Sequence, residues 1–261
     1  MEKNFTNLGA REENINSSND TIFWDNKNPD ELLEIAGKNP AKFDDILILL
    51  ARKVKGEMQT LSDEGKEDDR EVNQENMKIL LGKVSEESIE KLSKLFEIAN
   101  ENNKRDGNIE DKDRNFNISK NGVEVSISNI DKCIYLKINL SGSNEKAKYV
   151  IDTESPDNKN EFKITILHRI THPNSQKDSI EEWLDKVVEY AAKRAGIKVL
   201  NFQSNDSFEN IEYPLNNGYI YDTLDGKKWA SEILKKIYDN PSGYKKSRDS
   251  KIYTLKKQLF S

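Results

Sequence analysis

The chain has few of the residues that most often carry metal or redox chemistry: one cysteine and two histidines among 261 residues. With Cys133 alone, no intramolecular disulfide can form, and nothing points to an oxidising compartment. Cys133 lies in an alternating strand pattern, so we expect a buried, unreactive thiol. His168 and His172 are four residues apart, which spans about 13 Å in a strand. They cannot then bind one ion together, and we expect no metal cofactor.

Long apolar runs are also missing. No stretch approaches the length that crosses a bilayer, and residues 1–20 lack the apolar centre of a signal peptide. We therefore expect a cytoplasmic protein with no membrane partner; delivery into another cell stays open as an alternative. The formal net charge of −6 argues against nucleic acid as the main partner.

Signature motifs for a reaction class are absent as well. The sequence contains no phosphate-binding P-loop, no nucleophile elbow, no CxxC pair and no HExxH. The acidic runs DEGKEDD and NIEDKD lack the spacing of a calcium loop and are typical of solvated linkers. Any chemistry must therefore be inferred from the fold.

The first part of the chain has a helical pattern. Residues 1–28 are predicted to be a disordered leader, and 29–102 a region of three to four helices. Asn28 suits the cap of the first helix and Pro29 its first turn. Two further helices are predicted over 73–84 and 85–101. This region has packing faces but no polar cluster suited to chemistry, so we expect it to dock a protein partner.

Residues 103–115 are charged and nearly free of apolar side chains, which predicts a linker. After it the apolar period changes to two, and we expect an antiparallel meander. Its predicted strands are 122–130, 132–140, 147–153 and 161–171. A helix over 178–195, ended by Gly196, then leads to a short apolar strand at 197–202. The rest predicts a short helix within 204–213, a strand at 218–224, a helix at 226–240 and a terminal strand at 251–260.

The fold class predicted from this pattern is α+β. An N-terminal helical region precedes a mixed, mainly antiparallel sheet that is flanked by helices. Residues 116–261 in this order resemble the GCN5-related N-acetyltransferase (GNAT) fold. KITILHRITHP resembles the central strand of the family, which ends in a proline before the cofactor loop. VEYAAKRAGIKVLNFQSND resembles its long helix, glycine turn and next strand, and NGYIY the start of its penultimate strand.

The resemblance implies that acetyl-CoA is the cofactor and that a loop reading Gln/Arg-x-x-Gly-x-Gly/Ala holds its pyrophosphate. In this sequence Gln176 matches, Ser179 replaces the first glycine and Glu181 replaces the small residue. Asp178 and Glu181 add negative charge beside the diphosphate, and Lys177 offsets only one of them. In the alternative, Asp178 or Ser179 is an ordinary helix N-cap and the cofactor site has been lost.

The resemblance also implies roles for single residues. The residues expected to contact the cofactor are Ile170, His172, Gln176, Lys177, Ser179 and Asn205. Tyr213 is the candidate acid that protonates the leaving thiolate, and His168 is the candidate base that deprotonates the amine. Structural packing is the alternative for both side chains. We also expect Pro214 to break the helix that precedes it.

Two functions follow from these observations. The first is a divergent GNAT-like acyltransferase that transfers an acetyl group from acetyl-CoA to an amine. The second is a non-catalytic GNAT-like interaction protein, a bacterial effector or regulator, that binds a protein partner and no longer binds acetyl-CoA. The glycine-free acidic loop favours the second, and the order of the elements favours the first.

Overall fold

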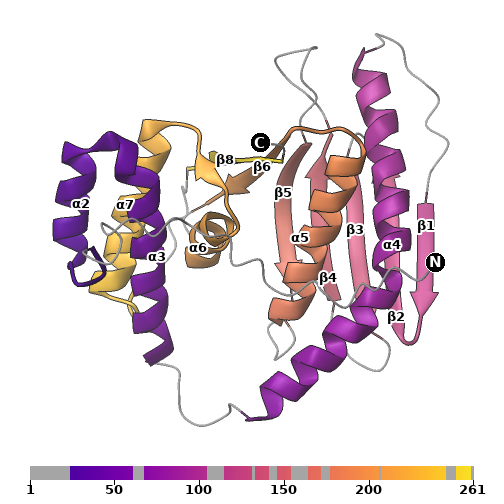
Figure 1. Cartoon of the computed structure of the whole chain (residues 1–261), viewed down its shortest axis with the longest axis horizontal. Helices are drawn as coiled ribbons and strands as arrows, with labels where there is room; N and C mark the ends of the chain where they lie inside the picture. Colours follow the sequence, from indigo (N-terminus) through magenta and orange to yellow (C-terminus); the bar gives the residue numbers. More distant parts are fainter. Residues whose placement is uncertain are drawn as a thin grey trace. The chain divides into compact units, whose positions relative to one another are not determined.

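The computed structural model describes residues 24–60, 68–104, 115–130, 133–140, 146–153, 164–171, 177–205, 207–244 and 251–259. Side chains are described for these residues except 59–60, 68–77, 102–104, 146, 167–171, 177–179 and 209. Helices and a mixed, mainly antiparallel sheet make an α+β fold, as predicted (Figure 1). No helix in the described ranges is long and apolar enough to cross a membrane.

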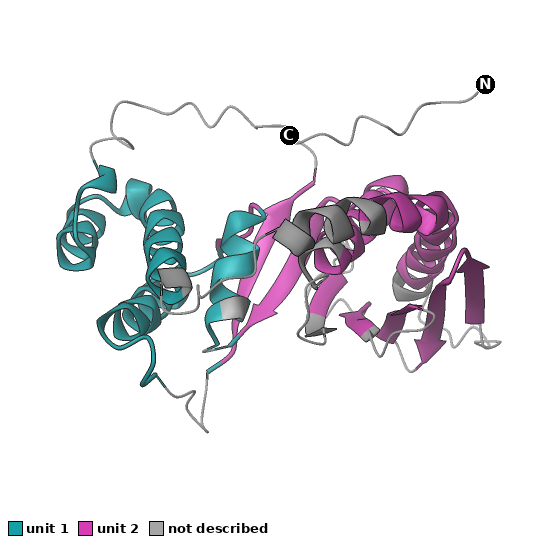
Figure 2. Cartoon of the chain, turned by 90° about the horizontal axis from the view of Figure 1, so that it is seen from below, with its two compact units in different colours: residues 1–63, 205–217, 221–251 teal, residues 64–204, 218–220, 252–261 magenta. Residues whose placement is uncertain are grey.

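The chain divides into two compact units, each made of segments that are distant in sequence (Figure 2). Unit 1 comprises residues 1–63, 205–217 and 221–251, and unit 2 comprises 64–204, 218–220 and 252–261. These divisions differ from the predicted boundaries at 102 and 116. The last part of the predicted helical region belongs to unit 2, and two helices of the predicted GNAT-like domain belong to unit 1.

Unit 1 is helical. Its elements are α2 (Pro29–Lys38), the 3-10 helix η2 (Pro40–Lys42), α3 (Phe43–Thr60), α6 (Phe208–Asn216) and α7 (Leu224–Asp239). Helix α3 packs against α2, α6 and α7, so it is the centre of this unit. The fully buried apolar side chains at its core include Leu32, Ile46, Leu47, Leu50, Ala230 and Leu234.

The sequence predicts the start of α2 correctly but not the end of α6. Asn28 and Glu31 form a reciprocal capping box before Pro29, which confirms the predicted start of α2. The prediction that Pro214 breaks α6 is wrong, because the helix continues to Asn216. Pro214 lies in the last turn of this short helix, where its missing N–H removes only one backbone hydrogen bond.

Unit 2 contains a sheet with the strand order β1-β2-β3-β4-β5-β6-β8-β7. The strands are β1 (Asn115–Lys120), β2 (Val123–Ile130), β3 (Cys133–Leu140), β4 (Lys146–Asp152), β5 (Ile164–Thr171), β6 (Val199–Ser204), β7 (Ile220–Tyr221) and β8 (Tyr253–Gln258). Strands β1 to β5 form an antiparallel meander, β5 and β6 are parallel, and β6 pairs antiparallel with β8. The four predicted meander strands are confirmed.

Strand β1 was not predicted, because most of its residues are polar and it follows a charged segment directly. Only Phe116 and Ile118 alternate as apolar positions in it. Asn121 and Gly122 connect β1 to β2 with φ values of 50° and 83°. Positive φ at both positions of a two-residue connection is typical of a tight hairpin turn.

Helix α4 (Asp68–Lys104) is one continuous helix of 37 residues, and the prediction of two helices over this stretch is wrong. The sequence predicts Ser85 as the start of the second helix. Its hydroxyl instead donates to the carbonyl of Leu81 one turn earlier, at 2.8 Å. Ser88 does the same to Val84 at 2.7 Å. Serines that bond back into their own helix do not end it.

Helix α5 (Lys177–Arg194) follows β5 and leads into β6. The apolar face of α5 is buried, and Gly196 ends the helix with φ 73°, as predicted. Because α5 begins at Lys177, Asp178 and Ser179 lie inside the first turn, and their prediction as N-caps is wrong.

Helices α4 and α5 cover one face of the sheet (Figure 1). They pack against each other, α4 packs on β1 and β2, and α5 packs on β4. Strand β3 shows the consequence: Ile134, Leu136, Ile138 and Leu140 are buried, and the residues between them are not. The intervening residues Cys133, Tyr135, Lys137 and Asn139 mark the other face, which no described helix of unit 2 covers. We call this the open face. Cys133 is half-buried, so its expected burial is only partial.

Candidate functional site

The parallel strands β5 and β6 separate after a short paired segment. Their register pairs are Ile164↔Leu200, Thr165↔Asn201 and Ile166↔Phe202. Beyond this point β5 continues to Thr171 and β6 continues to Ser204. Figure 1 shows the two strands starting side by side and then running apart. We call this opening the β5–β6 divergence.

Each strand at the divergence is held in place by its other neighbour. Strand β4 pairs with β5 as far as Thr171, and β8 pairs with β6 as far as Ser204. A register shift between Val150 and Ile151 locally disturbs β4 beside β5; such irregularities bend a strand. The divergence is therefore part of the sheet architecture and does not reflect fraying. Ligands of open α/β sheets commonly bind at the carboxyl ends of parallel strands.

A cluster of ionisable side chains lies on the helix side of these strands. The Tyr149 hydroxyl on β4 donates a 2.5 Å hydrogen bond to the Asp185 Oδ1 on α5. Tyr219, which immediately precedes β7, packs its ring against Phe202 of β6, with 5.9 Å between the ring centroids. Burial raises the pKa of Tyr219 well above its ordinary value, and the charges of Asp185 and Glu189 raise it further. The Tyr219 hydroxyl therefore stays protonated.

Glu189 links this cluster to two lysines. Its carboxylate accepts hydrogen bonds of 2.7 Å from Lys193 and from Lys257 of β8. Burial alone would raise the pKa of Glu189, but the hydrogen bonds and charges of the two lysines lower it overall. The Lys257 ammonium also lies 5.8 Å from the centroid of the Tyr219 ring. Together Tyr149, Asp185, Glu189, Tyr219 and Lys257 form what we call the helix-side cluster.

The register places the helix-side cluster beside the divergence. Tyr149 lies opposite Arg169, a β5 residue beyond the last pair with β6. Phe202, which contacts Tyr219, is the last β6 residue that pairs with β5. Beside the divergence, β4 thus contributes Tyr149, α5 contributes the two carboxylates, and β8 contributes Lys257.

The other face of the paired segment carries a polar pair. The Asn201 Nδ2 donates to the Thr165 Oγ1 at 3.5 Å, across the middle of the three register pairs. The Asn201 Oδ1 is buried and has no hydrogen-bond donor among the described groups. A buried amide oxygen in this state is an acceptor that a ligand N–H can satisfy.

The predicted site residues of β5 and α5 belong to unit 2. His168 and Ile170 lie on β5 beyond Ile166, and Lys177 and Ser179 lie in the first turn of α5; only their backbone is described. His172 and Gln176 lie outside the described residues.

Two residues near the start of α5 are described in full. Glu181 is buried, with 4% of its surface exposed. The Trp183 side chain is directed toward α4, because its Nε1 donates to the Ser85 Oγ at 2.8 Å. Trp183 therefore braces the two helices against each other.

Asn205 and Tyr213 belong to unit 1. The Asn205 Oδ1 accepts hydrogen bonds from the Ser207 backbone N–H at 3.1 Å and from the Asn210 Nδ2 at 2.9 Å. These bonds shape the entry into α6. Tyr213 lies half-buried on α6.

Sequence reasoning missed most of the helix-side cluster. Tyr149 and Asp185 are 36 residues apart, and no local pattern connects a strand tyrosine to a helix aspartate at that distance. Tyr219 is buried, with 5% of its surface exposed. In the described ranges no group of three or more His, Cys, Asp or Glu is placed to hold a metal ion.

Comparisons with protein-family models, with curated proteins and with solved structures give no match to this chain. What the site can do is therefore inferred from its geometry and from the resemblance of residues 116–261.

Proposed function

We propose that the chain is a divergent GNAT-like acyltransferase that transfers an acetyl group from acetyl-CoA to an amine. The observation that carries this proposal is the β5–β6 divergence, a parallel pair that opens after Ile166 and Phe202. The resemblance places the cofactor between these two strands.

The divergence has the chemistry to accept the amide-bearing arm of acetyl-CoA. Backbone groups of β5 that point toward β6 have no strand partner beyond Ile166 among the described residues. Extended ligands bind such groups as an added strand would. The Asn201 Oδ1 offers a further acceptor one residue before the end of the paired segment.

The first turn of α5 supplies the expected contacts for the cofactor's phosphates. Lys177 and Ser179 lie in that turn, where free backbone N–H groups and the helix dipole favour an anion. His172 and Gln176, which precede it, are proposed to contribute as the resemblance implies, with Ile170 on β5.

The transfer itself needs a base and an acid. In the proposed reaction the amine nitrogen, deprotonated by His168, attacks the thioester carbonyl carbon. The carbon–sulfur bond then breaks, the acetyl group stays on nitrogen, and the thiolate takes a proton from Tyr213. Asn205 is carried over as a cofactor contact from the same resemblance.

One observation favours the alternative, a non-catalytic interaction protein. Glu181 is a buried carboxylate in the stretch where the family has a small residue beside the diphosphate. A negative charge there opposes binding of a second negative group. In this alternative the helical region 29–102 would dock the partner.

Calorimetric titration of acetyl-CoA into the whole protein separates the two functions. We expect micromolar binding that Ser179→Glu weakens by about tenfold or more, because the resemblance implies that this position lies beside the diphosphate. Gln258→Glu is the matched control: it adds the same charge at an exposed position that pairs with Val199, the start of β6. The affinity of Gln258→Glu for acetyl-CoA should equal that of the wild type.

Absence of binding at millimolar acetyl-CoA would contradict the proposal and favour the interaction protein. If acetyl-CoA binds, thiol release with a panel of amines tests the transfer. Tyr213→Phe should then lower kcat more than it weakens cofactor binding.

A further inference from the structure

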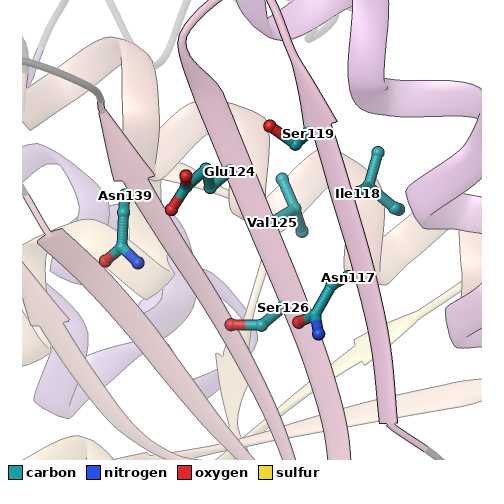
Figure 3. Close-up of a pocket in the computed structure, with 7 residues that line it drawn as sticks. All are labelled: Asn117, Ile118, Ser119, Glu124, Val125, Ser126 and Asn139. Carbon is teal, nitrogen blue, oxygen red and sulfur yellow. The ribbon is translucent and has the colours of Figure 1, made fainter.

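A hollow of about 330 Å³ lies on strands β1, β2 and β3 of unit 2 (Figure 3). Five polar residues line it: Asn117, Ser119, Glu124, Ser126 and Asn139. Ile118 and Val125 complete the lining, but their side chains are buried and alternate with these polar residues along the strands. The hollow therefore offers amide, hydroxyl and carboxylate groups and no exposed apolar anchor.

The polar residues form a continuous patch because they are register neighbours. Asn117 lies opposite Ser126, and Glu124 lies opposite both Ser119 and Asn139. Such directly opposite side chains are about 5 Å apart at Cβ. Asn139 is one of the residues that define the open face, so the hollow is part of that face.

Two lysines lie on the same face near the hollow: Lys137 is next to its lining, and Lys148 of β4 is next to Lys137. Lys137 lies opposite Ser126 on one side and opposite Lys148 on the other. Like charges directly opposite each other destabilise a sheet. Neither lysine forms an ion pair within the described part of unit 2; the Lys148 ammonium lies 4.5 Å from the centroid of the Tyr135 ring. Within the described residues, two neighbouring cations thus lie here without a carboxylate in ion-pair contact.

This chemistry distinguishes between classes of ligand. A protein partner would need buried aromatic or aliphatic anchors, which the hollow does not have. Single-stranded nucleic acid would need open aromatic faces for stacking, and Lys148 lies over the Tyr135 ring. The volume is at the lower end of the range for small-molecule sites, about 300 to 1,000 Å³. A small ligand that has hydroxyl groups and a negative charge fits all of these features.

We propose that this hollow binds a hydroxyl-rich anion, a sugar that carries a phosphate or a carboxylate. Asn117, Glu124 and Asn139 hydrogen-bond the hydroxyl groups, and Lys137 and Lys148 bind the anionic group. The bound anion offsets the repulsion between the two lysines. This site is independent of acyl transfer, since none of its residues belongs to the β5–β6 divergence or to the helix-side cluster.

The test is an NMR titration of the whole protein, followed through the side-chain amide signals of Asn117 and Asn139. The probes are glucose 6-phosphate and glucuronate, with glucose and inorganic phosphate as comparators. We expect saturable shifts with both anionic sugars, and affinities about tenfold or more weaker for each comparator. No saturable shift with either sugar would overturn the proposal. Equal binding of inorganic phosphate would also overturn it, since the lysines would then act as a simple anion patch.

Variants separate the lysines from a general effect of charge. Replacing both Lys137 and Lys148 by methionine should weaken glucose 6-phosphate binding about tenfold or more. The melting temperature of this double variant should not fall, because a repulsion is removed. Lys198→Met is the matched control, an exposed lysine in the connection from α5 to β6, and should bind as the wild type does. Unchanged binding in the double variant, or an equal loss in Lys198→Met, would contradict the assignment.

Asn139→Ala provides a second variant. It should weaken the binding of both anionic sugars, and unchanged affinity would contradict the assignment of the hydroxyl groups.

Discussion

Glu189 accepts hydrogen bonds from two lysines at once, and this makes its carboxylate the central charge of the helix-side cluster. One of these lysines belongs to the same helix, and the other comes from β8. Glu189 therefore ties α5 to the strand that closes the sheet next to β6. Hydrogen bonds to an ionised group contribute more to the free energy of unfolding than bonds between neutral groups do, about 1.5 to 3 kcal/mol each.

We expect this link to weaken in acid. The pKa of Glu189 is lower in the folded protein than its ordinary value of 4.5. Its stabilising contribution is complete above that value and is lost as the pH falls through the folded pKa. Glu189→Gln should therefore reduce the free energy of unfolding at neutral pH, and the difference from wild type should shrink below pH 4.5.

Urea denaturation across this pH range measures the effect. Glu232→Gln, which removes an exposed carboxylate on α7, is the control. A stability difference between wild type and Glu189→Gln that stays constant with pH would contradict the assigned role.

Single-residue predictions succeeded where the cause was local. The cap at Asn28 and the glycine at 196 depend on backbone geometry within one turn, and both are confirmed. The bond between Tyr149 and Asp185 depends on how α5 packs on β4, so the sequence near either residue contains no sign of it. The candidate site was therefore predictable in its strands and helix but not in its buried side-chain contacts.

Among the helices and strands, α5 shows how an end can be fixed by one residue. The Gly196 N–H donates to the Lys193 carbonyl, and the Ile197 N–H donates to the Ala192 carbonyl. This pattern requires the left-handed backbone of Gly196, which glycine adopts at little cost. The turn delivers the chain directly into β6, and hence to the divergence.

Gly196→Ala should lower the free energy of unfolding by about 1 kcal/mol, because alanine is strained at φ 73°. No heavy atom lies within 4 Å of the added Cβ, so the cost comes from the backbone alone. Gly82→Ala is the matched comparison in the middle of α4, where the added Cβ is equally free. There we expect a gain of about 0.5 to 1 kcal/mol.

Thermal or urea unfolding of the two variants measures these changes in the free energy of unfolding. A similar effect of the same sign in both would contradict the assigned difference in backbone geometry.

The errors at this scale have a common origin. Helix α4 was divided in two because Ser85 has the residue type of a cap, while its hydroxyl bonds within the helix. Strand β1 was missed because its polar sequence resembles the linker before it. Residue type shows where a helix or strand can end. Packing of α4 against α5, and of β1 against β2, determines where each one does end.

In the whole molecule, both units are assembled from distant segments. Helix α7 was predicted to flank the sheet, yet it packs on α3 of unit 1. Helix α4 was predicted to belong with α2 and α3, yet it covers β1 and β2. An apolar stripe shows that a helix must be covered but does not show by which element.

Shortened chains should distinguish these packing relations. A chain of residues 64–261 lacks α2 and α3, so we expect the amides of α7 to lose protection from hydrogen exchange while those of β2 and β3 keep it. A chain of residues 116–261 also lacks α4, which leaves the apolar face of β2 uncovered, and its β2 amides should lose protection too. Full protection of β2 in the shorter chain would contradict the division into these units.

The discontinuity of unit 1 has a consequence for protein synthesis. Helix α3 ends at Thr60 and its partner α6 begins at Phe208. At about 5 to 20 residues per second, the ribosome needs roughly 7 to 30 s to make the segment between them. During that time the apolar stripes of α2 and α3 have emerged without α6 and α7 to cover them, while all of β1 to β5 is being made. The nascent chain therefore has a window in which a holdase chaperone has an exposed helical surface to bind, and the window closes only when α7 leaves the exit tunnel.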